Sequence, residues 1–201
     1  GVICEILKED GSMARLTDLN RLKKKWGLKL ISIASLIEYR HKREKLIEQI
    51  SESDFPCPSG NFKLRVFRSI LDGRIHHALT LGKFSTRTPT LVRVQTADTL
   101  RDALGFEETS GSTGTINKSL DLIAKQKKGA LLYMEPRRPD FDRWSKFKDP
   151  RSKDTEPPRM DFRDYGIGAQ FLVALGIKYL KLISRDHRKV VGLEGSGLEI
   201  T

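Results

Sequence analysis

The stretch Asp161-Phe-Arg-Asp-Tyr-Gly-Ile-Gly-Ala-Gln170 and the apolar run behind it decide how the C-terminal part of the chain folds. Apolar residues recur there at the spacing of one face of a short helix. The residues on this face are Ile167, Phe171, Ala174 and Leu175. Gly176 marks the end of the helix, and the run 179–183 is typical of a buried strand. The sequence therefore predicts a loop, a helix, a strand and a second loop, in that order.

Polar side chains stand at both ends of this helix–strand unit. Asp161 and Arg163 come before the helix, and Ser184 and Lys189 follow the strand. Guanidinium forks onto phosphate oxygens and stays protonated at any ordinary pH, so Arg163 by itself predicts a phosphate clamp. Together the four side chains suit an anionic substrate such as a nucleotide. The alternative is an ordinary helix–strand unit with solvated charges.

Length and composition limit the class of protein. With 201 residues, of which 38% are hydrophobic, the chain has room for one or two domains with an apolar core. The net charge of +11 fits nucleic acid and equally fits an enzyme for phosphorylated substrates. No apolar run approaches the roughly 20 residues of a membrane helix, and the first residues lack a secretory signal. Two cysteines, Cys4 and Cys57, make no disulfide framework, which favours a reducing compartment such as the cytoplasm.

The other segments predict a mixed α/β fold. Helices are expected over 19–26 and 116–123, with a further one from Ser35 to about Ile50. Strands are expected over 1–7, 28–33, 62–70, 75–81, 91–94 and 130–134. Asp72-Gly73 predicts a hairpin turn, and the composition of 51–60 predicts a linker. The adjacent histidines His76 and His77 point to opposite faces of their strand, so we interpret them as structural and not as ligands of one metal.

The segment 161–170 resembles the signature of GTP cyclohydrolase II, the enzyme that opens the guanine ring of GTP at the start of riboflavin synthesis. The resemblance continues through Leu182-Ile-Ser-Arg-Asp-His-Arg-Lys189 and Gly192-Leu-Glu-Gly-Ser-Gly-Leu-Glu-Ile200. It implies that Asp161 is the proton acceptor and that Arg163 attacks the α-phosphate. It also implies GTP contacts from three further residues: Arg93, Ser184 (where the family has Thr) and Lys189.

The chain departs from this family between residues 95 and 160. The family binds zinc with three cysteines, and Asp98, Thr109 and Gly111 stand at those positions here. Because thiolates hold the zinc that activates water, we predict no metal site. The family's glycine-rich triphosphate loop is replaced by Glu135-Pro-Arg-Arg-Pro-Asp140, and its catalytic Tyr is absent.

Residues 1–53 resemble the C-terminal end of 3,4-dihydroxy-2-butanone 4-phosphate synthase. The segments that carry the resemblance are Gly1-Val-Ile-Cys-Glu-Ile6, Asp10-Gly-Ser-Met-Ala-Arg15 and Ser32-Ile-Ala-Ser-Leu-Ile-Glu-Tyr-Arg40. The family's essential Glu corresponds to Glu5, while its magnesium ligands correspond to no residue of this chain. We therefore expect that Glu5 alone does not catalyse the synthase reaction.

Both resemblances together imply a bifunctional-type riboflavin-biosynthesis protein, with a synthase-like part at 1–53 and a degenerate cyclohydrolase-like part at 54–201. They imply a phosphorylated small molecule such as GTP as ligand, no cofactor held by this chain, a homodimer, and a cytoplasmic location (plastid in a plant or alga). No membrane or nucleic-acid partner is expected. Two alternatives stay open. One is an active cyclohydrolase with an unorthodox site. The other is a nucleic-acid binder that uses the basic and aromatic side chains of 137–148.

Overall fold

A computed structural model describes residues 1–104, 114–136, 162–184 and 196–201, and at 34, 37–38, 41–42, 100–101 and 162–165 it describes the backbone alone. The helices of this part are α1 Leu16–Trp26, α2 Ile33–Arg43, α3 Thr99–Asp102, α4 Thr115–Gln126 and α6 Phe162–Ala174. The strands are β1 Ile47–Cys57, β2 Gly60–Ser69, β3 Ile75–Leu81, β4 Thr90–Thr96, β5 Gly129–Met134, β6 Tyr179–Leu182 and β7 Glu199–Ile200.

All seven strands form one mixed sheet in the order β1-β2-β3-β5-β4-β6-β7. The strands from β1 to β5 along this order are antiparallel neighbours, and those from β5 to β7 are parallel neighbours. The turn between β2 and β3 falls at Asp72–Gly73, as the sequence predicts. The mixed α/β class expected from the sequence is thus confirmed.

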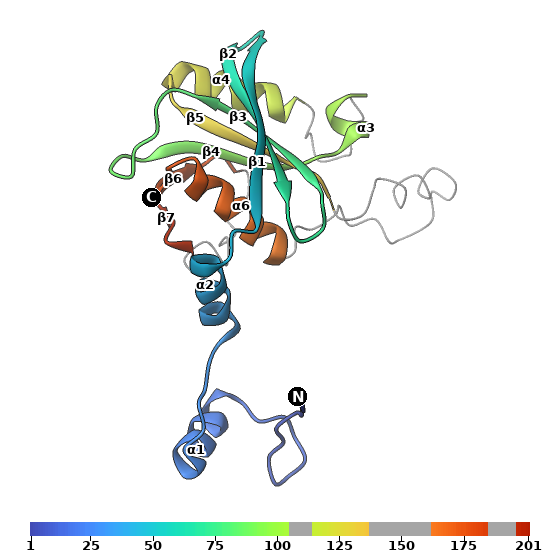
Figure 1. The fold of residues 1–201 in the computed structure, drawn as a ribbon, viewed down its shortest axis with the longest axis vertical. Coiled ribbons are helices and arrows are strands. Elements are labelled where there is room, and N and C mark those ends of the chain that lie inside the picture. The colour runs from blue at the N-terminus through green and yellow to red at the C-terminus, as the bar shows by residue number, and fades with distance from the viewer. Residues whose placement is uncertain (105–113, 137–161, 185–195) are drawn as a thin grey trace, which may run out of the picture.

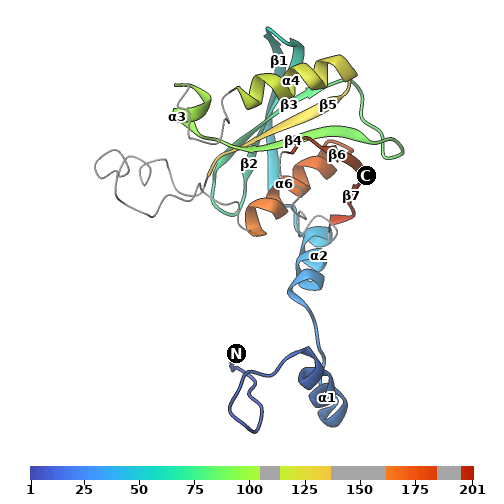
Figure 2. The same ribbon diagram turned by 180° about the vertical axis from the view of Figure 1, so that it is seen from behind.

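Helices cover both faces of the sheet (Figures 1 and 2). One apolar cluster joins α6 to the sheet and includes Phe67, Val92, Leu132, Ile167, Phe171 and Leu180. A second cluster joins α4 to the opposite face and includes Phe62, Leu120, Ile123 and Leu131. The two clusters exist because side chains alternate between faces along each strand, as the alternating burial of β3 shows.

The path of the chain brings three strand ends to one edge. From β4 the chain returns through α4 to β5 on one side, and then through α6 to β6 on the other side of β4. Because β4 is parallel to both neighbours, the three strands end at the same edge, which we call the carboxyl edge. In open α/β sheets the point where the strand order reverses in this way is the usual place for a ligand.

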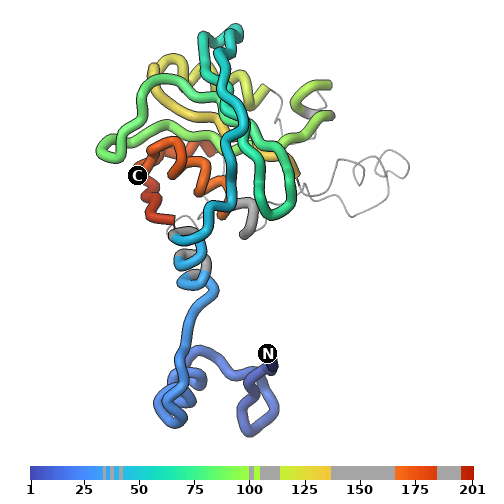
Figure 3. The backbone as a smooth tube through the Cα atoms, viewed as in Figure 1, coloured from blue at the N-terminus to red at the C-terminus, as the bar shows by residue number. Residues whose placement is uncertain are grey.

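Residues 1–43 form an extension outside the sheet, which we call the arm (Figure 3). Its helix α1 ends at Gly27, whose φ of 63° is left-handed, and α2 begins at Ser32, whose hydroxyl accepts the Ser35 N–H at 3.0 Å. No described side chain of the arm is buried. Large apolar side chains, among them Ile3 and Trp26, are exposed there.

The structure corrects several predictions around the arm. The strands expected at 1–7 and 28–33 are absent from this described part, where only an isolated bridge joins Leu7 to Met13, because no neighbouring strand supplies hydrogen bonds. The second helix begins at Ile33 and ends at Arg43, short of the predicted Ile50.

The predicted linker at 51–60 is also wrong. Most of it belongs to β1, which pairs with β2 along its length and crosses the predicted boundary between 53 and 54. Its polar composition reflects an exposed edge strand, which natural proteins keep charged to prevent association.

Candidate functional site

Arg93 connects two of the strands that end at the carboxyl edge. It lies on β4, on the face that α4 covers, two residues beyond Leu91 of the α4 cluster. Its Nη1 donates to the backbone oxygen of Ile183 at 2.8 Å, and its Nη2 donates to Oε1 of Gln95 at 2.7 Å. Arg93 therefore holds β4 to the end of β6, directly beside Ser184.

A second polar group surrounds Asp98, at the start of α3. Asp98 is buried, and its backbone N–H donates to Oδ2 of Asp102 at 3.0 Å. The same oxygen accepts the hydroxyl of Tyr133 on β5 at 3.0 Å. The first turn after β4 is thus fixed to the neighbouring strand. Asp98 directly before Thr99 is an N-cap type of residue and thus a helix-start signal that sequence reasoning missed, whereas the role of Tyr133 follows only from strand pairing.

The end of β5 is held from the β3 side. The backbone N–H of Glu135 donates to Nδ1 of His76 at 3.1 Å. The backbone oxygen of Glu135 accepts a hydrogen bond from Nη1 of Arg74 at 2.5 Å. His76 is buried against Phe171 of α6, while His77 is half-buried on the other face. The prediction that the two histidines are structural and face opposite ways agrees with this arrangement. Among the described residues, no group of three His, Cys, Asp or Glu is placed to hold a metal.

The sequence-predicted site residues divide into three sets. Arg93 and Ser184 lie together, and Arg163 lies in the first turn of α6, which begins at the same edge. Asp161 and Lys189 fall outside the described residues. Glu5 is exposed in the arm, whose N-terminal end lies away from the sheet (Figure 1).

The donors at this edge do not fit a thiolate zinc site. Cys57, the last residue of β1, lies at the opposite edge of the sheet, where its thiol donates to the Gly60 oxygen at 3.3 Å. Cys4 is exposed in the arm, and the sequence has no cysteine beyond Cys57. Asp98, at the first ligand position of the resemblance, forms part of a helix start instead.

Comparison with protein families assigns the two parts of the chain separately. The family model of GTP cyclohydrolase II matches residues 48–201, and that of 3,4-dihydroxy-2-butanone 4-phosphate synthase matches residues 1–39. The chain belongs to the GTP cyclohydrolase II family over the larger of these ranges. The change between the two matches falls where α2 leads into β1.

Curated riboflavin biosynthesis proteins are similar to the chain over its whole length. It is 40% identical over 213 residues to the riboflavin biosynthesis protein RibBA of Aquifex aeolicus, covering 100% of this chain and 52% of the relative. It is 38% identical over 211 residues to RibBA of Chlorobium phaeovibrioides, covering 100% of this chain and 51% of the relative. The chain therefore spans about half the length of these relatives.

A solved structure shares the fold. RibBX, a two-domain 3,4-dihydroxy-2-butanone 4-phosphate synthase from A. baumannii, aligns with a TM-score of 0.59 and 27% identity, covering 98% of this chain and 53% of that one. None of the helices in the described ranges is long and apolar enough to cross a membrane.

Proposed function

We propose that residues 48–201 bind a phosphorylated nucleotide, such as GTP, at the carboxyl edge without opening its ring. The observation that carries this proposal is the contact of Arg93 with the end of β6 that leads to Ser184, at the edge where α6 begins with Arg163. Charge-assisted contacts of guanidinium and ammonium with phosphate are strong and need no zinc. Nucleotide binding therefore persists where the chemistry of ring opening is lost.

The second part of the proposal is that the chain is an inactive or regulatory companion of a butanone-phosphate synthase. Residues 1–201 alone do not catalyse the synthase reaction. Two observations support this part of the proposal: the sequence has no cysteine beyond Cys57, and RibBX is described as a two-domain synthase. The homodimer implied by the family resemblance stays a prediction.

Titration calorimetry with GTP, ATP and pyrophosphate tests nucleotide binding. We expect weak binding, and Arg163→Ala or Lys189→Ala to weaken it by about 1.5–3 kcal/mol, the range for hydrogen bonds to charged groups. Lys125→Ala is the matched control, since it removes one exposed positive charge from the last turn of α4, which precedes the start of β5 and not its end. Absence of binding, or an unchanged affinity in Arg163→Ala, would contradict the proposal.

Assays of product separate the proposal from an active enzyme. Release of formate from GTP, with about one zinc per chain after dialysis, would establish a cyclohydrolase with an unorthodox site. Formation of butanone phosphate from ribulose 5-phosphate by 1–201, abolished by Glu5→Gln, would show that Glu5 acts without the synthase family's other residues. We expect neither product.

A further inference from the structure

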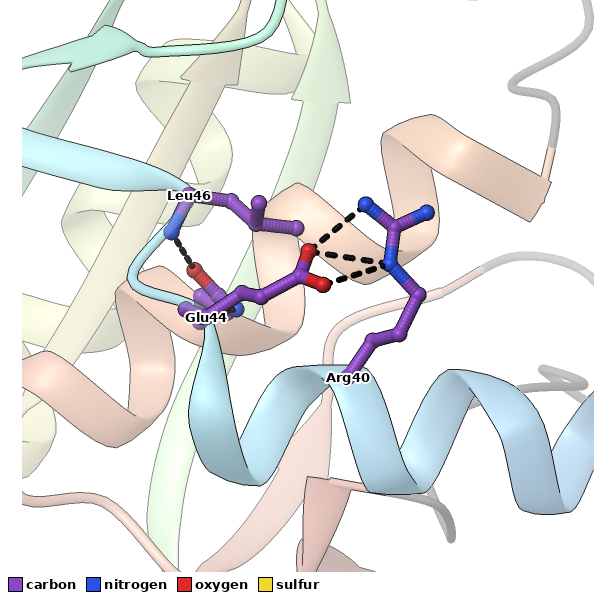
Figure 4. Close-up of polar contacts among 4 residues, drawn as sticks. Arg40, Glu44 and Leu46 are labelled. Atoms are coloured by element: carbon purple, nitrogen blue, oxygen red, sulfur yellow. Dashed lines mark hydrogen bonds and ion pairs between the residues drawn. The ribbon is translucent and has the colours of Figure 1, made fainter.

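A side chain of α6, Gln170, binds the segment that joins the arm to the sheet. The carboxamide of Gln170 donates from Nε2 to the backbone oxygen of Glu44 at 3.0 Å. Its Oε1 accepts the backbone N–H of Leu46 at 2.9 Å (Figure 4). Both bonds are partly buried and span more than 120 residues of sequence, since their separations are 126 and 124.

Each side of this contact is itself fixed. On the sheet side, the Ile70 N–H donates to the Leu46 oxygen at 2.9 Å, and the next residue, Ile47, belongs to the apolar core. Gln170 is half-buried on α6, between the fully buried Ala169 and Phe171. The Gln170 carboxamide thus lies on a packed helix, and the Leu46 backbone that it binds is already hydrogen-bonded to the sheet.

On the arm side, Glu44 is bound to Arg40 in the last turn of α2. The Glu44 N–H donates to the Arg40 oxygen at 2.6 Å. The Arg40 guanidinium binds the Glu44 carboxylate through Nε at 2.9 Å and Nη2 at 2.6 Å (Figure 4). Two donors in a fixed fork restrict orientation more than a single contact does. Glu44 therefore continues the last turn of α2, and the bond from Gln170 to its backbone oxygen joins that turn to α6.

From this geometry we infer that Gln170 is a positioning residue that sets the placement of the synthase-like arm on the cyclohydrolase-like domain. A carboxamide offers a donor and an acceptor side by side, which is what a peptide oxygen and the N–H two residues later require. The inference goes beyond the proposed function, because it holds whether or not a nucleotide binds. It also gives the last residue of the segment 161–170 a role that does not involve a ligand.

The test compares Gln170→Met with the unaltered 1–201 chain. Methionine keeps the length and much of the volume of the side chain but makes neither bond. Spin labels on Lys23→Cys in α1 and Asn61→Cys in β2, with Cys4 and Cys57 replaced by Ser, report the arm-to-sheet distance distribution. Hydrogen exchange measures the exchange rate of the Leu46 backbone amide. The exchange rate of the Leu131 amide serves as a measure of the stability of the core.

We expect the distance distribution to broaden in Gln170→Met and the Leu46 amide to exchange about tenfold faster, with Leu131 unchanged. Gln170→Glu keeps an acceptor for the Leu46 N–H and loses the donor to Glu44, so it should broaden the distribution while Leu46 stays protected. Gln49→Met is the matched control, because Gln49 is exposed on β1 and its side chain donates a hydrogen bond to the nearby Glu52 at 3.4 Å.

Two results would overturn the inference. One is a distance distribution in Gln170→Met equal to that of the unaltered chain. The other is equally accelerated exchange of Leu131 and Leu46, or loss of the fold altogether, since Gln170 would then stabilise the sheet as a whole and not the placement of the arm.

Discussion

At the turn between β2 and β3, Asp72 and Arg74 form a compact polar contact. The Arg74 Nε donates to Oδ2 of Asp72 at 2.9 Å, and Nη1 continues to the Glu135 oxygen at the end of β5. Partial burial alone would raise the pKa of the Asp72 carboxyl, but the neighbouring Ser69 hydroxyl and the Arg74 guanidinium outweigh it and hold the pKa below its ordinary value. A carboxyl with a lowered folded-state pKa stabilises the fold above the ordinary pKa, and this contribution is lost as the pH falls through the folded-state value.

Asp72→Asn is therefore expected to lower the free energy of unfolding by about 0.5–1.5 kcal/mol at neutral pH. The difference between the two proteins should shrink as the pH falls below 3.8, where the carboxyl of the unaltered chain takes up a proton. Urea unfolding at neutral and acid pH measures it. Asp54→Asn serves as control, because the Asp54 side chain is 87% exposed and should give no measurable change. A pH-independent loss in Asp72→Asn would count against the assignment.

At the scale of the elements, α6 supplies Ile167, Ala169, Phe171 and Leu172 to the apolar cluster on its face of the sheet. Its Phe171 ring is fully buried and stacks on Phe67 of β2 with ring centroids 4.7 Å apart. It also lies against His76, which holds the backbone of Glu135. The apolar side of α6 thus connects the core to the carboxyl edge, while Gln170 connects the same helix to the arm.

Truncation of Phe171 to Ala should lower the free energy of unfolding by about 3–5 kcal/mol, because it removes a buried ring and leaves a cavity. Val173→Ala on the same helix should cost far less, since Val173 is half-exposed. Chemical unfolding of both variants checks this difference. Equal losses would contradict the idea that packing of Phe171 on Phe67 determines the stability of α6, because alanine improves helix propensity at both positions.

For the whole molecule, the arm and the sheet differ in how they are stabilised. The sheet has a packed core on both faces, whereas no described residue of the arm is buried. Exposed apolar side chains in such number are typical of a surface that another part of a protein covers. The relatives, about twice as long as this chain, contain additional sequence in which such a part can reside.

Removal of residues 1–45 should therefore leave the midpoint of thermal unfolding nearly unchanged and reduce binding of an apolar fluorescent dye. The physical reason is that no described side chain of the arm belongs to the core of the sheet. Among the described residues, most of the large apolar side chains that are exposed lie in the arm. Calorimetry and dye fluorescence of 1–201 and 46–201 measure the two effects. A large fall in the midpoint would mean that the arm stabilises the sheet.

Local patterns in the sequence determined the elements whose hydrogen bonds are local or whose neighbours are close in the chain. The helix around Phe171, its end at Gly176, the strand that follows, and the hairpin at Asp72–Gly73 all agree with the structure, because periodicity and turn chemistry are local properties. The two family resemblances were likewise readable from contiguous residues, and the family models match both parts.

The tertiary structure alone decided what depends on distant partners. The polar run at 51–57 becomes a strand only because β2 pairs with it, and 28–32 does not become one because no strand lies beside it. The contact of Arg93 with Ile183 and that of Gln170 with Glu44 and Leu46 join residues 90 or more positions apart. Such contacts arise from the order of strands and the packing of α6, which no local pattern encodes, and they determine both the candidate site and the placement of the arm.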